Sequence, residues 1–438
     1  MHTSCVAPEL LSPAGSLRAM RLAFAYGADA VYAGLPRFSL RVRNNSFDVP
    51  TLALGISEAH AQGKAFYLVV NIAPHNNKVR TLIERLRPLI AMQPDALIVS
   101  DPGVVWLLRQ HFADVVLHLS VQANTVNWAA VRFWQEQGIS RIILSRELSI
   151  EEIAEIRQRV PDMELEVFVH GALCMAYSGR CMLSGYFNHR DPNQGACTNA
   201  CRWQYQAKPA AEDEQGHWQP VLLEDKTRPG ELMPIDEDEH GSYILNSKDL
   251  RALEYVAELT RMGVHSLKIE GRTKSPYYVA RTAQVYRRAI DDAVAGRALN
   301  LSLLHELDGL ASRGYTAGLL DRHAKPEQLQ NLARAHGRGK QLWVGELSGH
   351  SGEWFEVEVK NAFSVGDQLT LLTPESNHSF RLHEMLDSNN LSIARAPGSG
   401  HRVQIKLPVK CDLVTALLVK DIVPEADGVK VIDRSATV

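Results

Sequence analysis

The stretch ELEVFVH, residues 164–170, is a short and mostly apolar run that continues directly into GALC. Runs of the same kind recur through the first two thirds of the chain: ELL (9–11), DAVYA (29–33), AFYLVVN (65–71), DALIV (95–99), VVLHL (115–119), RIILS (141–145) and HSLKIE (265–270). Nearly continuous runs of Val, Ile, Leu, Phe and Tyr are typical of parallel strands that are buried on both faces. We therefore predict eight buried strands.

Amphipathic segments with helix signals separate these runs. We predict helices over residues 17–26, 51–62, 126–137, 150–159, 250–262 and 276–293. The fourth follows Ser149 and carries Glu152 three residues later, which is the pattern of a capping box. Repeated strand–helix units favour an α/β fold of the closed (β/α)8 type, because right-handed parallel crossovers leave few other solutions. A doubly wound open sheet is the alternative, but neither the dinucleotide fingerprint G-x-G-x-x-G nor a G-x-x-x-x-G-K-[ST] loop occurs.

Two changes in pattern define the predicted domains. Residues 171–243 have no clear helix or strand period, and residues 206–241 are polar and rich in Asp, Glu, Pro and Gly, so we expect a long loop there. After about residue 340, short alternating runs such as WFEVEVKN are separated by Gly, Asn, Ser and Pro. We therefore predict a TIM-like barrel over 1–335 with a cysteine-bearing insertion at 171–243, and a small antiparallel β-barrel over 341–425.

The bulk composition is that of an ordinary globular protein, with 45% hydrophobic and 22% charged residues among 438. No apolar run reaches the length of a membrane span, and MHTSCVAPELLSPAG lacks a secretory pattern, so we expect a cytoplasmic location and no membrane partner. The net charge of −3 offers no global argument for nucleic acid. We interpret two local clusters of basic residues as solvated surface: Arg37, Arg41 and Arg43, and Arg334, Arg338 and Lys340.

Four of the six cysteines lie within 28 residues, at Cys174, Cys181, Cys197 and Cys201. In a reducing compartment a pair of structural disulfides is disfavoured, so metal binding is the leading interpretation. The spacing is C-x6-C-x15-C-x3-C. Four irregularly spaced thiolates suit a [4Fe–4S] cluster, and the C-x3-C pair also fits half of a zinc site, so both metals remain open.

Polar residues follow most of the predicted strands, at the end where barrel enzymes keep their active sites. As a set they predict a pocket for a polar, anionic ligand, with Arg146, Lys268 and Arg272 as partners for carboxylate or phosphate. His170 adjoins the cysteines and is either a core histidine or a functional one. The candidate catalytic residues are Arg146, Glu147, Lys268, Glu270, Arg272 and His170, and the candidate substrate-binding residues are Asn71, Gln122, Asn124, Arg146 and Arg272. Ser100 and Asp101 belong to the same polar set.

Several long motifs resemble the collagenase-like peptidases, a family of unknown catalytic type. They are EVFVHGALCMAYSGRCMLSG, GADAVYAG, HLSVQANTVNW, RDPNQGACTNACRW and MGVHSLKIEGRTKSPYYVARTAQVYRRAIDDA. The resemblance covers nearly the whole chain and is strongest to tRNA-hydroxylating members. It implies an iron–sulfur protein that helps install 5-hydroxyuridine at the wobble position of tRNA, with prephenate as a required metabolite. It also assigns the cluster to the four clustered cysteines.

The expected function is therefore a tRNA-modifying enzyme, with tRNA and prephenate as its partners. Two alternatives remain. One is a peptidase for collagen-like or other peptides, although neither H-E-x-x-H nor G-x-S-x-G occurs. The other is a non-enzymatic RNA-binding scaffold that holds structural zinc.

Overall fold

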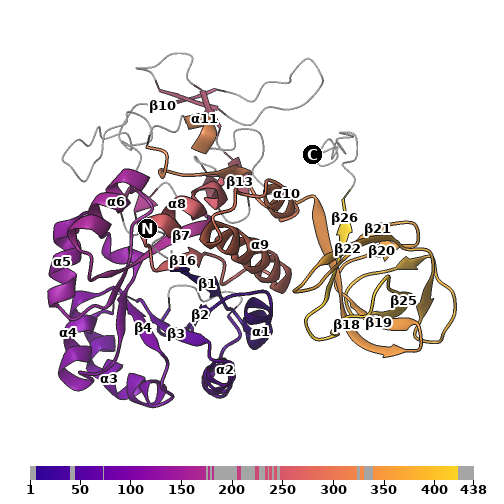
Figure 1. Ribbon diagram of the computed structural model, residues 1–438, viewed down its shortest axis with the longest axis horizontal. Helices are drawn as coiled ribbons and strands as arrows, with labels where there is room; N and C mark the ends of the chain where they lie inside the picture. Colours follow the sequence, from indigo (N-terminus) through magenta and orange to yellow (C-terminus); the bar gives the residue numbers. More distant parts are fainter. Residues whose placement is uncertain are drawn as a thin grey trace, which may run out of the picture. The chain divides into compact units, whose positions relative to one another are not determined.

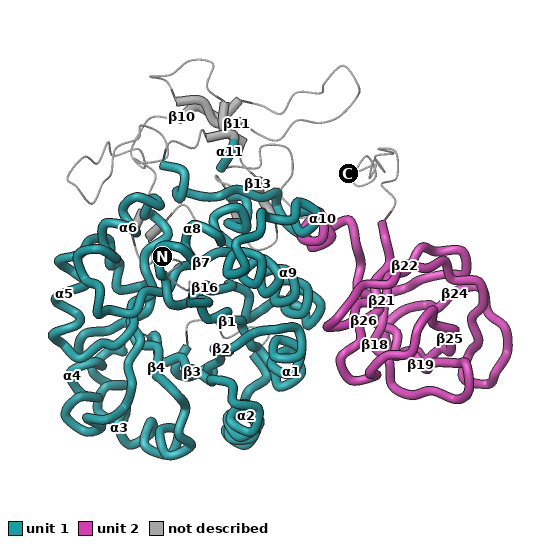
Figure 2. The backbone as a smooth tube through the Cα atoms, in the orientation of Figure 1, with its two compact units in different colours: residues 1–304, 312–337 teal, residues 305–311, 338–438 magenta. Residues whose placement is uncertain are grey.

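The chain is seen here in a computed structural model (Figure 1). It describes residues 6–39, 45–72, 74–173, 247–322, 326–329 and 339–422, together with the backbone of short strands between residues 176 and 243. The chain divides into two compact units, shown in Figure 2. Unit 1 comprises residues 1–304 and 312–337, and unit 2 comprises residues 305–311 and 338–438.

Among the described residues of unit 1, eight parallel strands form a closed barrel. They are β1 (Glu9–Pro13), β2 (Ala30–Ala33), β3 (Ala65–Val70), β4 (Ala96–Val99), β5 (Leu117–Leu119), β6 (Arg141–Ile143), β7 (Glu164–Gly171) and β16 (Ser266–Ile269). Each strand pairs with the next in this order, and β16 pairs with both β7 and β1, which closes the ring. Every predicted run overlaps one of these strands, so the predicted barrel is confirmed.

Helices surround this barrel (Figure 1). They are α1 (Leu17–Ala25), α2 (Val49–Ala61), α3 (Asn76–Ile90), α4 (Pro102–His111), α5 (Trp128–Glu136), α6 (Ile150–Arg159), α8 (Val256–Met262) and α9 (Pro276–Val294). Two shorter helices follow, α10 (Ser302–Asp308), whose residues are divided between the two units, and α11 (Pro326–Leu329). Helix α6 has the predicted bounds, and Ser149 and Glu152 form the predicted capping box. Helices α3 and α4 were not predicted. None of the helices in the described part of the chain is both long enough and apolar enough to span a membrane.

The helix predicted over 250–262 is wrong in its first half. The structure has a strand, β15 (Asp249–Arg251), and a 3-10 turn, η4 (Leu253–Tyr255), before α8 begins. Strand β15 pairs antiparallel with the end of β7 and parallel with β17 (Tyr315–Thr316). Pairing between segments distant in the sequence therefore overrides the local helical pattern.

The insertion contains short strands that its sequence pattern did not predict. The pairs are β8 (Ala176–Tyr177) with β9 (Arg180–Cys181), and β13 (Asp236–Asp238) with β14 (Gly241–Tyr243). A third group joins β10 (Tyr205–Lys208), β11 (Leu222–Asp225) and β12 (Leu232–Pro234). The stretch expected to be a long loop, 206–241, thus carries backbone pairing.

The described part of unit 2 is built around an antiparallel sheet. Its order is β22-β21-β26-β18-β19-β25-β23. These strands are β18 (Gln341–Ser351), β19 (Trp354–Val359), β21 (Gln368–Leu372), β22 (Asn377–Arg381), β23 (Met385–Asp387), β25 (Arg402–Lys406) and β26 (Leu417–Asp421), and β20 (Phe363–Ser364) pairs with β24 (Arg395–Ala396). Buried Val, Leu, Ile and Phe side chains form its core, so an antiparallel β-domain after residue 340 is confirmed.

Candidate functional site at the mouth of the barrel

A charged network crosses the lower interior of the barrel, near the amino-terminal ends of the strands. Nη1 of Arg141 on β6 lies 2.6 Å from a carboxylate oxygen of Glu9 on β1, and its Nε lies 2.8 Å from Glu164. The hydroxyl of Tyr67 on β3 donates to the same Glu9 carboxylate at 2.6 Å. Strands β1, β3 and β6 are not neighbours, so these contacts span the interior. Burial opposes the charge on Arg141, but Glu9 and Glu166 beside it raise its pKa.

A buried ion pair lies above this network. Nζ of Lys268 is 2.6 Å from Oε1 of Glu166, and the two side chains are 4% and 0% exposed. Burial lowers the pKa of Lys268, against the attraction of Glu166. Nearby, burial together with Arg141 and Lys268 holds the pKa of His118 well below its usual value. Lys268, a candidate catalytic residue, is therefore bound to Glu166 inside the barrel rather than exposed at its mouth.

Two arginines lie over two aromatic rings at the carboxyl-terminal ends of the strands, which we call the mouth. The guanidinium of Arg146 is 4.0 Å from the ring centre of Phe168, and that of Arg272 is 5.6 Å from the ring centre of Tyr32. Nζ of Lys268 approaches the same rings, at 5.5 Å from Phe168 and 4.3 Å from Tyr32. Three cations thus share one aromatic platform, an arrangement that cation–π attraction stabilises.

Hydrogen bonds fix the orientation of both arginines. Nη1 of Arg146 donates to the carbonyl of Ala172 at 2.9 Å, and Nη1 of Arg272 donates to the Ser39 hydroxyl at 2.7 Å. Nη2 of Arg146 lies 3.9 Å from Glu270. Nε of Arg146 is buried and has no hydrogen-bond partner among the described residues. A buried donor of this kind is costly unless a ligand or water satisfies it, so Arg146 is suited to bind an anion.

Glu270 is tied to the aromatic platform as well as to Arg146. The hydroxyl of Tyr32 donates to the Ile269 carbonyl at 2.9 Å and lies 3.3 Å from Oε2 of Glu270. Burial, and then the charge of Glu270, raise the pKa of Tyr32 well above its usual value. Tyr32 is therefore a neutral hydrogen-bond donor at physiological pH. Glu147, also predicted in this set, is half-buried in the turn after β6.

The other predicted pocket residues gather on the β3–β5 side of the mouth. Nδ2 of Asn71 donates to Oε1 of Gln122 at 2.6 Å. Nδ2 of Asn124 donates to the Gln122 carbonyl at 3.1 Å, and Asn124 has a left-handed backbone with φ 52°. Ser100 donates to the Asn71 carbonyl, whereas Asp101 caps the start of α4. The structure thus joins Asn71, Gln122 and Asn124 in one hydrogen-bonded group.

His170 does not face the mouth. A register shift between β7 and β16 pairs His170 with Ile269, so it lies on the outer face of the barrel. Its ring contacts those of Tyr278, Tyr286 and Tyr315, and its Nδ1 is 3.3 Å from the Tyr286 hydroxyl. Burial lowers the pKa of His170 to about 3. His170 is therefore a neutral core histidine in this structure, which agrees with the first of its two predicted interpretations.

The predicted metal ligands lie largely outside the described residues. Cys174, Cys197 and Cys201 are not described, and for Cys181 the structure describes the backbone in β9. Among the described residues, no group of three or more His, Cys, Asp or Glu side chains is placed to hold a metal ion. Cys411 is a free, half-buried thiol in unit 2. The chain toward Cys174 leaves the mouth at Ala172, whose carbonyl binds Arg146.

Several site residues were missed by sequence reasoning. Tyr32, Phe168 and Ser39 hold the arginines, and Glu166 holds Lys268. A signal was present for one of them, Glu166. Glu166 and Lys268 are charged residues inside otherwise apolar runs, and a buried charge in a strand demands a partner.

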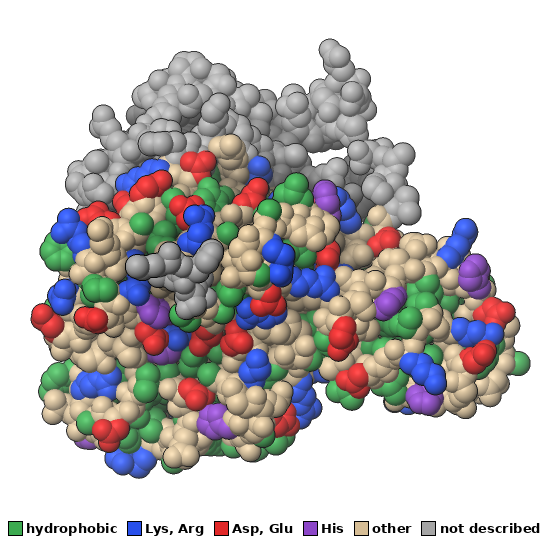
Figure 3. All heavy atoms as spheres, viewed as in Figure 1, with side chains coloured by type: hydrophobic (Ala, Val, Ile, Leu, Met, Phe, Trp, Pro, Cys, Tyr) green, Lys and Arg blue, Asp and Glu red, His purple; other side chains and the backbone are tan. Residues whose placement is uncertain are grey.

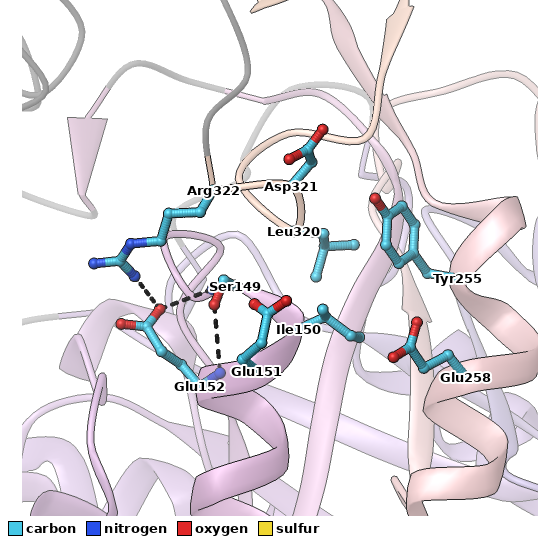
Figure 4. Close-up of a pocket in the computed structure, with 9 residues that line it drawn as sticks. All are labelled: Ser149, Ile150, Glu151, Glu152, Tyr255, Glu258, Leu320, Asp321 and Arg322. Atoms are coloured by element: carbon cyan, nitrogen blue, oxygen red, sulfur yellow. Dashed lines mark hydrogen bonds and ion pairs between the residues drawn. The ribbon is translucent and has the colours of Figure 1, made fainter.

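An acidic groove, also missed, lies at the start of α6. It has a volume of about 610 Å³ and is open to solvent. Its lining is Ser149, Ile150, Glu151, Glu152, Tyr255, Glu258, Leu320, Asp321 and Arg322 (Figure 4). Arg322 and the backbone N–H of Ser149 both bind Glu152. Burial, and then Asp321 and the nearby glutamates, raise the pKa of Tyr255. Four carboxylates against one arginine in the lining make this groove unsuited to an anionic ligand.

Comparison with known proteins identifies the family. The model of peptidase family U32 matches residues 15–330, and that of the peptidase family U32 C-terminal domain matches residues 340–417. The tRNA hydroxylation protein P of Escherichia coli (strain K12) is 57% identical over 94% of this chain and 97% of its own length. The protein of the same name from Haemophilus influenzae is 54% identical over 95% and 96%.

A more distant relative acts on another RNA, according to its name. The 23S rRNA 5-hydroxycytidine C2501 synthase of Escherichia coli (strain K12) is 33% identical over 66% of this chain and 40% of its own length. The family models cover both units, and the close relatives match nearly end to end. The chain therefore belongs to peptidase family U32.

Proposed function

We propose that this protein is a tRNA-modifying enzyme that hydroxylates C5 of the wobble uridine. The observation that carries the proposal is the 57% identity, over nearly the full length of both chains, to a tRNA hydroxylation protein. The name of the ribosomal RNA relative specifies a 5-hydroxypyrimidine product, which supports C5 as the position. A cytoplasmic location, where tRNA and reduced thiols are found, belongs to the same proposal.

The arginines at the mouth suit a small anionic co-substrate. We propose that this co-substrate is prephenate, which carries two carboxylates. Arg146 and Arg272 offer guanidinium groups held from different strand ends on one aromatic platform. Guanidinium–carboxylate pairs are strong because both partners are charged and the geometry allows two parallel hydrogen bonds. The partly buried setting strengthens such pairs by excluding water. In this proposal the two arginines bind and orient the co-substrate, and Glu270 keeps Arg146 in place.

An iron–sulfur cluster held by Cys174, Cys181, Cys197 and Cys201 is the second part of the proposal. Four thiolates are a suitable donor set for a [4Fe–4S] cluster. The segment that carries them follows β7, and the carbonyl of Ala172, two residues before Cys174, accepts a hydrogen bond from Arg146 at the mouth. When bound, the cluster would supply one-electron redox chemistry. Zinc at the same thiolates is the alternative, and it would supply structure without redox chemistry.

Peptide hydrolysis is the competing function suggested by the family name. In unit 2, Oγ of Ser376 lies 2.7 Å from Nε2 of His378. Ser376 lies in the tight turn between β21 and β22, where Thr373 also binds it, and His378 is the second residue of β22, paired with Leu371. In the described part of the chain, no carboxylate is recorded against His378 to orient it as a general base requires. This pair is therefore better explained as a hydrogen bond that stabilises the turn.

The decisive experiment is mass spectrometry of tRNA nucleosides from cells that lack this protein, with and without re-expression. We expect 5-hydroxyuridine derivatives to disappear and to return with the wild-type chain. An unchanged nucleoside profile would contradict the proposal. Peptide cleavage by the purified protein that survives substitution of all four clustered cysteines would favour the peptidase instead.

A further inference from the structure

Four exposed cations lie on one sector of the barrel rim. Arg37 follows β2, Lys78 and Arg80 lie in the first turns of α3 after β3, and Lys274 follows β16. Within the described residues, no salt bridge to a carboxylate is recorded for any of the four. We call this set the basic rim. Cations that are exposed and not neutralised by neighbouring acids remain available for an external anion.

The basic rim adjoins the candidate site. The barrel order is β16-β1-β2-β3, so the segments that carry these cations leave neighbouring strands at the same end of the barrel. Arg37 is two residues before Ser39, which accepts the hydrogen bond from Arg272, and Lys274 is two residues after Arg272. An extended anion along the rim would therefore pass directly beside the mouth.

The opposite sector of the rim is acidic. The groove at α6 and α8 carries four carboxylates, Glu151, Glu152, Glu258 and Asp321, against one cation, Arg322, which pairs with Glu152 (Figure 4). It adjoins β6, which is four strands from β2 in the eight-stranded ring. The charge is thus separated across the mouth, even though the net charge is −3. The face seen in Figure 3, by contrast, carries both signs intermixed over each unit.

We propose that the basic rim binds the phosphate backbone of the RNA substrate and that the acidic groove excludes the RNA from the other side. This inference rests on the proposed function and specifies which surface the RNA occupies. A polyanion with regularly repeated phosphates can engage cations from three separate segments at once. Repulsion by the acidic sector then restricts the RNA to an orientation that leads one nucleotide toward Arg272.

The helix α3 offers a matched control for this test. Arg85 and Arg87 are also exposed, and they lie seven residues after Lys78 and Arg80, on nearly the same helix face. That displacement is about 10 Å along the axis, away from the mouth. Lys78→Glu/Arg80→Glu and Arg85→Glu/Arg87→Glu therefore make the same change in net charge on the same helix. Circular dichroism of both variants checks that they fold.

The measurement is fluorescence anisotropy of an unmodified tRNA transcript with uridine at the wobble position, titrated with full-length protein between about 50 and 200 mM salt. We expect Lys78→Glu/Arg80→Glu to weaken binding by roughly tenfold or more at low salt. The logarithm of the association constant falls with the logarithm of the salt concentration, and the magnitude of this slope should decrease by about 2, because two phosphate contacts are lost. Arg85→Glu/Arg87→Glu should stay within about twofold of wild type at every salt concentration.

Several results would each overturn the inference. They are an equal loss in both double variants, no loss in either, and displacement of the transcript by polyglutamate as effective as by unlabelled tRNA, which would assign the rim to an acidic polypeptide. Nucleoside analysis in cells is independent of these measurements. If cells need the protein for the modification but Lys78→Glu/Arg80→Glu binds the transcript as tightly as wild type, the basic rim does not bind the RNA. The proposed function is then unaffected. A wild-type protein that fails to bind the transcript would overturn the inference as well.

Discussion

Nζ of Lys268 lies 2.6 Å from Oε1 of Glu166 in the closed interior of the barrel. The two residues are 102 positions apart in the chain and come from neighbouring strands. Below the pair is the network around Arg141, and above it are the rings of Tyr32 and Phe168. The pair therefore joins the charged lower layer of the barrel to the aromatic platform of the mouth.

Breaking this pair from one side should be strongly destabilising. Lys268→Met leaves the carboxylate of Glu166 buried, with Arg141 at 3.6 Å as its remaining cation. We expect the free energy of unfolding to fall by about 3–5 kcal/mol, because an uncompensated buried charge is costly. Urea unfolding followed by circular dichroism measures the change.

The double variant Lys268→Met/Glu166→Leu provides the control. Removing both charges avoids the unpaired carboxylate, so the double variant should be more stable than Lys268→Met alone. A Lys268→Met protein within about 1 kcal/mol of wild type would show that the pair contributes little to stability.

Arg272→Ala tests the anion site. We expect the level of hydroxylated wobble uridine per folded molecule to fall by roughly 30-fold or more, since a buried charged hydrogen bond is worth about 2–5 kcal/mol. Ser39→Ala removes the acceptor that Arg272 Nη1 binds at 2.7 Å, and it should give a smaller defect in the same direction. If Arg272→Ala lowers the melting temperature but leaves modification unchanged, Arg272 supports the fold and not the substrate.

Replacing any one of Cys174, Cys181, Cys197 and Cys201 by Ser should remove visible absorption, iron and acid-labile sulfide from protein purified without oxygen. Cys411→Ser should retain all three, because Cys411 is not one of the four clustered cysteines to which the cluster is assigned. A colourless wild-type protein containing one equivalent of zinc would contradict the iron–sulfur proposal and favour the scaffold.

His170 should make the protein sensitive to acid. Its pKa is about 3 in the folded chain, against an ordinary value of 6.5, so the unfolded chain binds the extra proton between these values. The stabilising contribution of neutral His170 is therefore fully present above pH 6.5 and is lost as the pH drops toward 3. At about pH 5 the loss from this residue is roughly 2 kcal/mol.

His170→Phe separates this contribution from other acid effects. The phenyl ring keeps contacts with the surrounding tyrosines, and the Tyr286 hydroxyl retains its 2.7 Å bond to the Val169 carbonyl. Between pH 7 and pH 5 the variant should lose about 2 kcal/mol less than wild type in urea unfolding. Equal losses would mean that His170 is protonated in the folded chain or that its ring is exposed.

The barrel could be predicted because its evidence is local. Each strand is buried on both faces, so each appears as a continuous apolar run, as in AFYLVVN and DALIV. Helix α6 could be bounded to the residue because Ser149 and Glu152 satisfy its first backbone N–H groups. By contrast, the segment from Asp249 to Arg251 has a helical pattern but pairs as a strand, because its partners come from β7 and β17.

Which residues of the site contact one another could be decided only by the tertiary structure. The chain itself indicated that Arg146, Lys268, Glu270 and Arg272 follow or end strands, which is enough to place them near one end of a barrel. It could not show that Lys268 binds Glu166, or that Tyr32 and Phe168 support the arginines, because barrel closure brings these distant residues together. Nor could it show that a register shift turns His170 outward. Periodicity is a property of neighbouring residues in the chain, whereas strand register and ring closure are set by the packing of all eight strands at once.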